Sequence, residues 1–533
     1  MISKEITKLL DTIQDYTYPE YLVAKEHEPR ISIGEIVSRA AQYYEKARYS
    51  IEYKEEHLLR RTAIERILRR RLTIDFTQEK SGELFLIELI QTGYLPNNEL
   101  PKRVAIPVQA IINKTVFFIS LLEHTYAEKQ YSHSRSLIIK LATSEIDDLL
   151  FPAIVDEATL KAFYRNVKDH ITITRSKKSA KEHEVQIYLA CRRGLFKEDD
   201  ATLFYHLWLM YYPEWTELND ANEETDEKLK KIAEEFNSIR ILIEEQLKSP
   251  LQQRLVTKLK NDIIYFSVIR KIVAKYRETS REIFEDPERL HFVVKDIAEE
   301  EYRNIHKRIR KSSWHAVIYI FMTKILLALA VELPFDLIIY KEVQYVALAI
   351  NVIFHPLLLF AMTTSITEPG SQNTTTISKG VRSVVCGNGH DMIILQMAKA
   401  RSSWGYVTGI LYLAMFLLSF GTIIWVLSRL NFNILGITFF MFFLTFVSYF
   451  GLRIRFIARR WIVHTDEHKF TTFLWDLFTL PIISLGRWLV LKFASINIFV
   501  FIMDFIIEAP FKIILRAIDT FALFIKEKKD EIY

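Results

Sequence analysis

Four long hydrophobic runs restrict this chain of 533 residues more than any other feature of its sequence. They cover residues 314–333, 344–366, 404–427 and 432–452. Each run reaches the roughly 20 apolar residues that a helix needs to cross a bilayer. Because only helices satisfy their own backbone hydrogen bonds inside lipid, the sequence predicts four membrane-spanning helices.

The rest of the chain also has a helical pattern, and we expect an all-α fold. We divide it into a helical cytoplasmic region at 1–286, a juxtamembrane helix at 287–313, the four-span domain at 314–452 and a membrane-interface tail at 453–533. The juxtamembrane helix is expected to continue into the first run. Polar residues interrupt the oily tail, which favours helices lying at the interface. The alternative is that two tail segments also cross, which gives six spans.

Lysine and arginine cluster in three segments: before the first run, between the second and third, and after the fourth. The other two loops carry only Lys341 and Arg429. The positive-inside rule therefore places both termini and the middle loop in the cytoplasm. The start of the chain lacks the apolar stretch of a signal peptide, so we expect no cleaved leader. Cys191 and Cys386 both fall on the predicted cytoplasmic side, where no disulfide is expected.

The net charge of +5 is mild, and the basic residues gather beside the membrane runs. We therefore expect anionic lipids at the cytoplasmic face as partners, and no nucleic acid. An arginine-rich stretch at 60–71 is read either as a lipid or nucleic-acid contact or as a solvated helix face. Nearby Glu55, Glu56 and Glu65 favour the solvated face.

The aromatic stretch at 203–212 is expected to be a core helix, with a docking patch as the alternative. The N-terminal region is also a candidate for binding a protein partner. Gly405 and Gly409 have the GxxxG spacing that lets helices approach closely in lipid. Packing within one bundle is the favoured interpretation, and a homo-oligomer through these glycines is the alternative.

A polar cluster is expected inside the membrane. Lys324 lies at the centre of the first run, where an uncompensated charge costs about 2.5 to 3.5 kcal/mol. Gln344, Asn351 and His355 share one face of the second run. An antiparallel hairpin places Lys324 level with about residue 353, close to Asn351 and His355. The cluster is either polar glue between helices, in which case Lys324→Met is tolerated, or an ion or proton site.

The stretch His464-Thr465-Asp466-Glu467-His468 matches the HxxEH pattern of inverted zinc proteases. That chemistry needs His464 and His468 as metal ligands, Glu467 as base and a third ligand. The stretch follows the fourth run directly, where a turn is expected, and downstream acids are few. We therefore expect no bound metal and no cofactor here.

The sequence identifies no substrate. Our leading interpretation is a non-enzymatic membrane protein whose helical cytoplasmic region binds or organises a partner at the inner face. A channel or ion-coupled transporter built on the polar cluster is the first alternative. A membrane zinc peptidase using the HxxEH stretch is the second.

Overall fold

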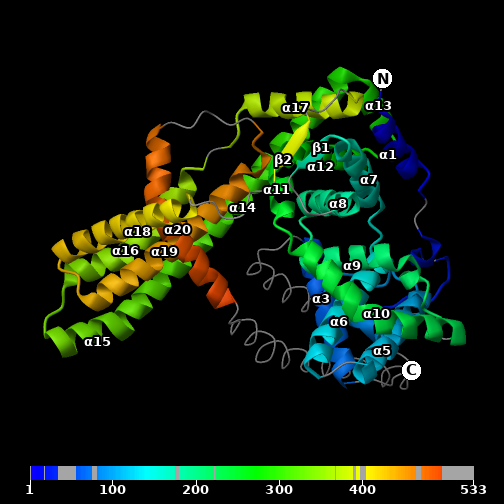
Figure 1. Cartoon of the computed structure of the whole chain (residues 1–533), viewed down its shortest axis with the longest axis horizontal. Helices are drawn as coiled ribbons and strands as arrows, with labels where there is room; N and C mark the ends of the chain where they lie inside the picture. Colours follow the sequence, from blue (N-terminus) through cyan, green and yellow to red (C-terminus); the bar gives the residue numbers. More distant parts are fainter. Residues whose placement is uncertain are drawn as a thin grey trace, which may run out of the picture. The chain divides into compact units, whose positions relative to one another are not determined.

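The computed structural model of the chain is helical almost throughout (Figure 1). It describes residues 2–16, 19–23, 25–33, 56–74, 81–125, 128–174, 179–220, 222–366, 368–387, 392–396, 404–463 and 470–494. The chain divides into two compact units. We call residues 281–386 and 398–503 the membrane unit, and residues 2–280 with 387–397 and 504–533 the N-terminal unit.

The N-terminal unit is built of helices, several of which begin after a polar N-cap residue. Ser179 forms a capping box with Glu182, and Asp199 and Asn222 accept the first-turn N–H groups of the helices that follow them. The helices are α1 (Lys4–Gln14), α3 (Glu56–Ile74), α4 (Ser81–Gln91), α5 (Ala105–Thr125), α6 (Glu128–Leu150), α7 (Ile154–Lys168), α8 (Ala180–Phe196), α9 (Asp200–Tyr211), α10 (Glu223–Leu247), α11 (Leu251–Lys258) and α12 (Lys260–Lys275), with short 3₁₀ turns at Glu20–Leu22, Lys102–Val104 and Pro213–Thr216.

An aromatic cluster forms the centre of this unit. The Trp208 ring lies 5.4 Å from Trp215 and 5.5 Å from Phe236, and Phe118 packs edge-on against Trp215 at 5.2 Å. Such pairs add to the gain from burying the rings. Trp208 comes from α9, so the aromatic stretch at 203–212 is a core helix, as predicted. Its last turn remains outside the core.

Helix α5 is long and apolar enough to cross a membrane, as are four helices of the other unit. Its apolar side chains are used inside the N-terminal unit, however, where α5 packs against α4, α6 and α10. Phe118 and Leu122 are fully buried, and so is Lys114, which pairs with Glu145 of α6. The hydropathy of α5 is therefore explained by its central place in this core.

A two-stranded parallel sheet is the only sheet in the described part of the chain. Strand β1 (Ile171–Thr174) pairs with β2 (Ile393–Gln396), and Ile171 lies opposite Ile393. A segment from between the second and third hydrophobic runs thus belongs to the N-terminal unit.

The membrane unit begins with α13 (Ser280–Glu285) and the long helix α14 (Pro287–Leu327). Asp286 caps α14, which continues without a break into the first hydrophobic run. A π-helical turn at Ala328–Glu332, α15 (Leu333–Phe335) and a second π turn at Asp336–Tyr340 extend it. The other helices are α16 (Tyr345–Thr364), α17 (Ser371–Cys386), α18 (Trp404–Arg429), α19 (Ile434–Ala458) and α20 (Phe470–Ala494), with a 3₁₀ turn at Arg459–Trp461.

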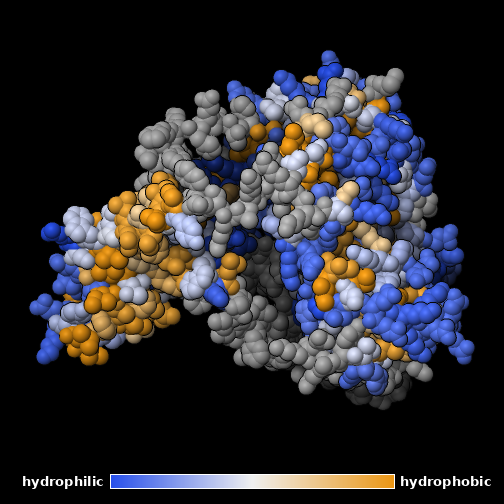
Figure 2. Space-filling view, in the orientation of Figure 1, coloured by the Kyte–Doolittle hydropathy of each residue, from blue (hydrophilic) through white to orange (hydrophobic). Residues whose placement is uncertain are grey.

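The helices of the four predicted runs expose apolar side chains. Leu326 is 69% exposed, and Ile338, Val346, Ile410 and other large apolar residues are similarly open. Figure 2 shows apolar side chains gathered on the surface of these helices, whereas the surface of the N-terminal unit is mostly hydrophilic. Apolar surface on this scale requires lipid around it. With four helices of this unit long and apolar enough to span, the chain is a multi-pass membrane protein.

Small residues bring helices of this unit into close contact. A Cβ atom on Gly486 of α20 would lie 2.1 Å from the backbone oxygen of Thr445 in α19, and one on Gly451 would meet the side chain of Met362. In Figure 1, α20 runs at a steep angle across α14, α16, α18 and α19. A Cβ atom on Gly409 would meet no described atom within 4 Å. A homo-oligomer through Gly405 and Gly409 stays a prediction.

Helix α17 opens the loop between the second and third hydrophobic runs. Its Asn373 donates to the Tyr302 hydroxyl at 2.7 Å and to the backbone oxygen of Trp461 at 2.8 Å, and it accepts from the backbone of Val463. One amide side chain therefore joins α14, α17 and the chain after α19. Tertiary hydrogen bonds make a helix from a stretch rich in Asn and Thr, whose local preference is for turns.

The arginine-rich stretch lies in α3 and is less solvated than we expected. Arg60 makes two hydrogen bonds to Asp147, and Arg70 and Arg71 both pair with Glu88. These acids belong to α6 and α4, far away in sequence. Of the acids predicted to pair within the helix, Glu65 pairs with Arg69.

Candidate functional site

The charged groups inside the membrane unit form a chain of hydrogen bonds. Lys324 Nζ donates to Asn351 Oδ1 at 2.7 Å, and Asn351 Nδ2 lies 2.9 and 2.8 Å from the two carboxylate oxygens of Glu332. Lys324 is 0%, Asn351 1% and Glu332 4% exposed. The amide of Asn351 therefore connects a buried cation to a buried anion, and each satisfies the other's charge away from water.

The π turn in the extended α14 helix makes this pairing geometrically feasible. Eight residues separate Lys324 from Glu332, and at 100° per residue an α-helix would place them about 80° apart. A π turn accommodates more residues per turn, and the one at Ala328–Glu332 rotates Glu332 back toward the side of Lys324. Such turns are frequent at functional sites, but here the turn also serves packing.

His355 lies one helical turn beyond Asn351 and is fully buried. Its Nε2 is 2.9 Å from the backbone oxygen of Phe440, and its Nδ1 is 3.2 Å from that of Asn351. A neutral imidazole has one N–H and donates to one of these oxygens. The Lys324 ammonium lies 4.2 Å from the ring centre of Phe443, which closes the cluster on the α19 side.

A second polar contact lies nearer the end of the extended helix. Buried Asp336 accepts a hydrogen bond from Asn433, whose other amide atom caps α19 at Gly436. Gln344 is exposed at the start of α16 and does not join the cluster. The structure thus brings Lys324, Asn351 and His355 together in one buried region. Glu332 and Asp336 were missed because they stand at the polar end of a run that we analysed for its apolar residues.

The HxxEH stretch lies outside the described residues, so His464, Glu467 and His468 have no structural account. In the part of the chain that is described, no group of three or more His, Cys, Asp or Glu side chains is arranged to hold a metal. The expectation that this stretch binds no zinc stays a prediction.

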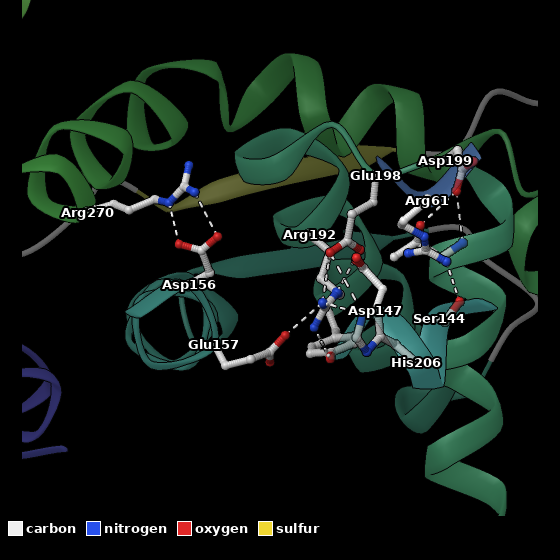
Figure 3. A network of polar contacts seen from close by, with 12 residues as sticks. Arg61, Ser144, Asp147, Asp156, Glu157, Arg192, Glu198, Asp199, His206 and Arg270 are labelled. Carbon is white, nitrogen blue, oxygen red and sulfur yellow. Dashed lines mark hydrogen bonds and ion pairs between the residues drawn. The ribbon is translucent and has the colours of Figure 1, made fainter. Parts of the chain in front are cut away.

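A buried ionic network occupies the N-terminal unit (Figure 3). Arg192 of α8 makes two 2.8 Å hydrogen bonds to Glu198, another to Glu157, and one of 2.5 Å to the His206 ring. Beside it, Arg270 of α12 binds both carboxylate oxygens of Asp156 at 2.6 and 2.7 Å. The network ties α7 to α8, α9 and α12.

The electrostatics of this network indicate structure rather than catalysis. Burial opposes the charge of Arg192, but the charge and hydrogen bonds of Glu198 outweigh it and hold the arginine pKa well above its ordinary value. Burial and the nearby Arg192 charge lower the pKa of His206 well below its usual range, so the ring is neutral and accepts a hydrogen bond from Arg192. Burial also raises the pKa of the Cys191 thiol, which is 0% exposed, and this disfavours the reactive thiolate.

The N-terminal unit also has a groove of about 610 Å³ along α5, which we call the α5 groove. Its floor is apolar, with Phe117 and Leu229, and Ile106 at its edge is 71% exposed. Its rim is acidic, with Glu83, Asp220 and Asp226 among the lining residues. Buried Lys114 also lines it but is engaged by Glu145 at 2.6 Å and the backbone of Trp215 at 2.7 Å.

The chain matches no known protein family, no characterised protein and no solved structure. Its function must therefore be argued from the geometry of its own residues.

We predict that the buried pair is sensitive to the loss of one partner and tolerant of losing both. Lys324→Met leaves the Glu332 carboxylate without its cation and should cost about 3 to 5 kcal/mol of stability. Because Glu332 is part of the cluster, we no longer expect Lys324→Met to be tolerated. Lys324→Met/Glu332→Gln should stay within about 1 kcal/mol of the parent protein. Thermal unfolding in detergent measures both.

Equal destabilisation by the single and double variants would contradict the pairing. The double variant also tests for transport, because we expect it to keep the fold while it removes both charges. Ion flux into vesicles that is present with the parent protein and absent with the double variant would favour transport over a structural role.

Proposed function

We propose that the chain is a non-enzymatic membrane protein that docks a protein partner in the α5 groove of its N-terminal unit. The observation that supports this most is the combination of an exposed apolar residue, Ile106, with a hollow whose rim is acidic. Among the described residues of this unit, few large apolar side chains are as open as Ile106. A concave surface with these properties is typical of a binding site.

The chemistry of the groove defines the class of partner. Asp220 and Asp226 provide negative charge at one rim, and Glu83 at another is only partly neutralised by Lys102 at 3.3 Å. Phe117 and Ile106 provide apolar contact. A basic amphipathic segment fits this pattern, because its apolar face would cover the floor while its lysines or arginines meet the rim.

The membrane cluster supports an anchoring role better than a transport role. Lys324, Glu332 and Asn351 satisfy one another, and Phe443 covers the ammonium. Each is nearly inaccessible to water. A pathway needs groups that are free to exchange a proton or an ion, whereas these groups hold α14, α16 and α19 together.

We further propose that the N-terminal unit and both termini are cytoplasmic, on the basis of the lysine and arginine distribution. In a Cys386→Ser background, which removes an exposed thiol, a membrane-impermeant reagent should label Lys341→Cys on intact cells. The same reagent should label Arg382→Cys only after the cells are opened. Labelling of position 382 alone from outside would reverse the orientation.

We predict that a photo-crosslinking amino acid in place of Ile106 yields a discrete protein adduct in native membranes. The same amino acid in place of Ile241, an exposed apolar residue of α10 that does not line the groove, is the matched control. Asp220→Lys/Asp226→Lys should abolish the adduct, because it reverses the charge of the rim. Glu223→Lys/Glu227→Lys, which changes the same charge elsewhere on α10, should leave it.

The proposal is wrong if positions 106 and 241 give the same adducts, or if both charge-reversal pairs have equal effects. The absence of any adduct at position 106 would also count against it.

A further inference from the structure

A second hollow, of about 600 Å³, lies beside the basic middle stretch of α14. We call it the α14 cleft, and its lining residues are Arg303, His306, Lys307, Arg310, Lys311, Trp314 and Glu368. We propose that the α14 cleft binds the phosphate headgroup of one anionic phospholipid. This inference does not depend on the docking proposal, since every residue of the cleft belongs to the membrane unit.

Helical geometry arranges these side chains into a track. At 100° per residue, Arg303, Lys307, Arg310 and Trp314 fall within about 60° of one another on the helix. His306 and Lys311 lie on either side of this stripe. With a rise of 1.5 Å per residue, three cations occupy about 10 Å of helix and end one turn before the tryptophan.

The cations of the track are available to a ligand. Arg303 lies at the 4.0 Å limit of an ion pair with Glu299, and its side chain is 60% exposed. For Lys307, Arg310 and Lys311, no ion-pair partner exists within 4.0 Å among the residues that the structure describes. All three are exposed. Several unpaired cations facing one hollow attract an anion, and arginine and lysine are the usual ligands of phosphate.

The position of Trp314 indicates a lipid rather than a soluble phosphate. Trp314 opens the first apolar run, is 51% exposed and packs against Phe360 of α16 at 5.7 Å. Tryptophan favours the headgroup level of a bilayer. Beyond it on the same side of α14, Ile318 is 52% and Phe321 36% exposed. A lipid with its phosphate on the cations would therefore have apolar surface beneath it for its acyl chain.

Glu368 adds a constraint on the headgroup. It follows α16 and contributes a carboxylate to a hollow that is otherwise basic. A carboxylate repels a phosphate but accepts a hydrogen bond from a hydroxyl or an ammonium group. The cleft therefore fits a headgroup that carries such a donor beyond its phosphate, such as the glycerol of phosphatidylglycerol. Four cations against one carboxylate leave the balance in favour of the anion.

The test measures lipid binding to the full chain in detergent by native mass spectrometry. The probes are phosphatidylglycerol and phosphatidylcholine. We expect the parent protein to retain one phosphatidylglycerol in preference to phosphatidylcholine. Lys307→Gln/Arg310→Gln should weaken phosphatidylglycerol binding about 25-fold, at about fivefold for each basic residue near an anionic surface.

A matched control separates a built site from general charge attraction. Arg308→Gln/Lys379→Gln removes the same charge from exposed positions of α14 and α17 that do not line the cleft. This pair should change binding by less than about twofold, and thermal unfolding should show that both pairs fold. Equal weakening by both pairs, or no weakening by the cleft pair, would overturn the proposal. Inorganic phosphate that displaces the lipid at an equal concentration would also overturn it, because the cleft would then recognise free phosphate.

Discussion

The hydrogen-bonded link from Lys324 through Asn351 to Glu332 is the interaction on which the membrane unit depends. Lipid offers no water to a charged group, so both charges must be compensated inside the bundle. Without that compensation, the free-energy cost of inserting the helices into the membrane is high. This requirement fixes which side of the extended α14 helix faces α16. Once those sides are turned inward, the apolar residues on the opposite sides face outward, where lipid covers them.

The two units use buried charge in similar ways but differ in what surrounds it. In the N-terminal unit, Lys114 and Glu145 form a buried pair within a core of aromatic and aliphatic side chains. Burial lowers the pKa of Lys114 and raises that of Glu145, and each opposite charge counteracts the shift of the other. Hydrophobic burial stabilises this core. The ion pair therefore needs only to compensate its own charges and does not have to hold the helices together. In the membrane unit, lipid provides no hydrophobic driving force between helices. Close packing and polar contacts must therefore determine which helix faces pair.

Much of this architecture follows from local sequence pattern, because hydrophobic length and helical periodicity are properties of neighbouring residues. They predicted the all-α fold, the four runs and the common depth of Lys324 and Asn351. Partners distant in sequence were not predictable, such as Asp147 for Arg60 of α3. Glu332 is only eight residues from Lys324 but was missed because it stands at the end of an apolar run. The π turn could not be predicted from the sequence either, since the hydrogen-bond spacings of an α-helix and a π-helix differ by a single residue.

The most direct test of this account is the distance between the Lys324 side chain and Asn351 in a lipid bilayer. Solid-state NMR on protein with ¹⁵N-labelled lysine and ¹³C-labelled asparagine measures the dipolar coupling between Lys324 Nζ and the Asn351 amide carbon. Asn351→Leu identifies the signal by removing it. We expect a weak but resolved coupling, consistent with the 2.7 Å hydrogen bond between Nζ and Oδ1. A Lys324 ammonium without coupling to Asn351, in protein shown to be folded, would contradict it.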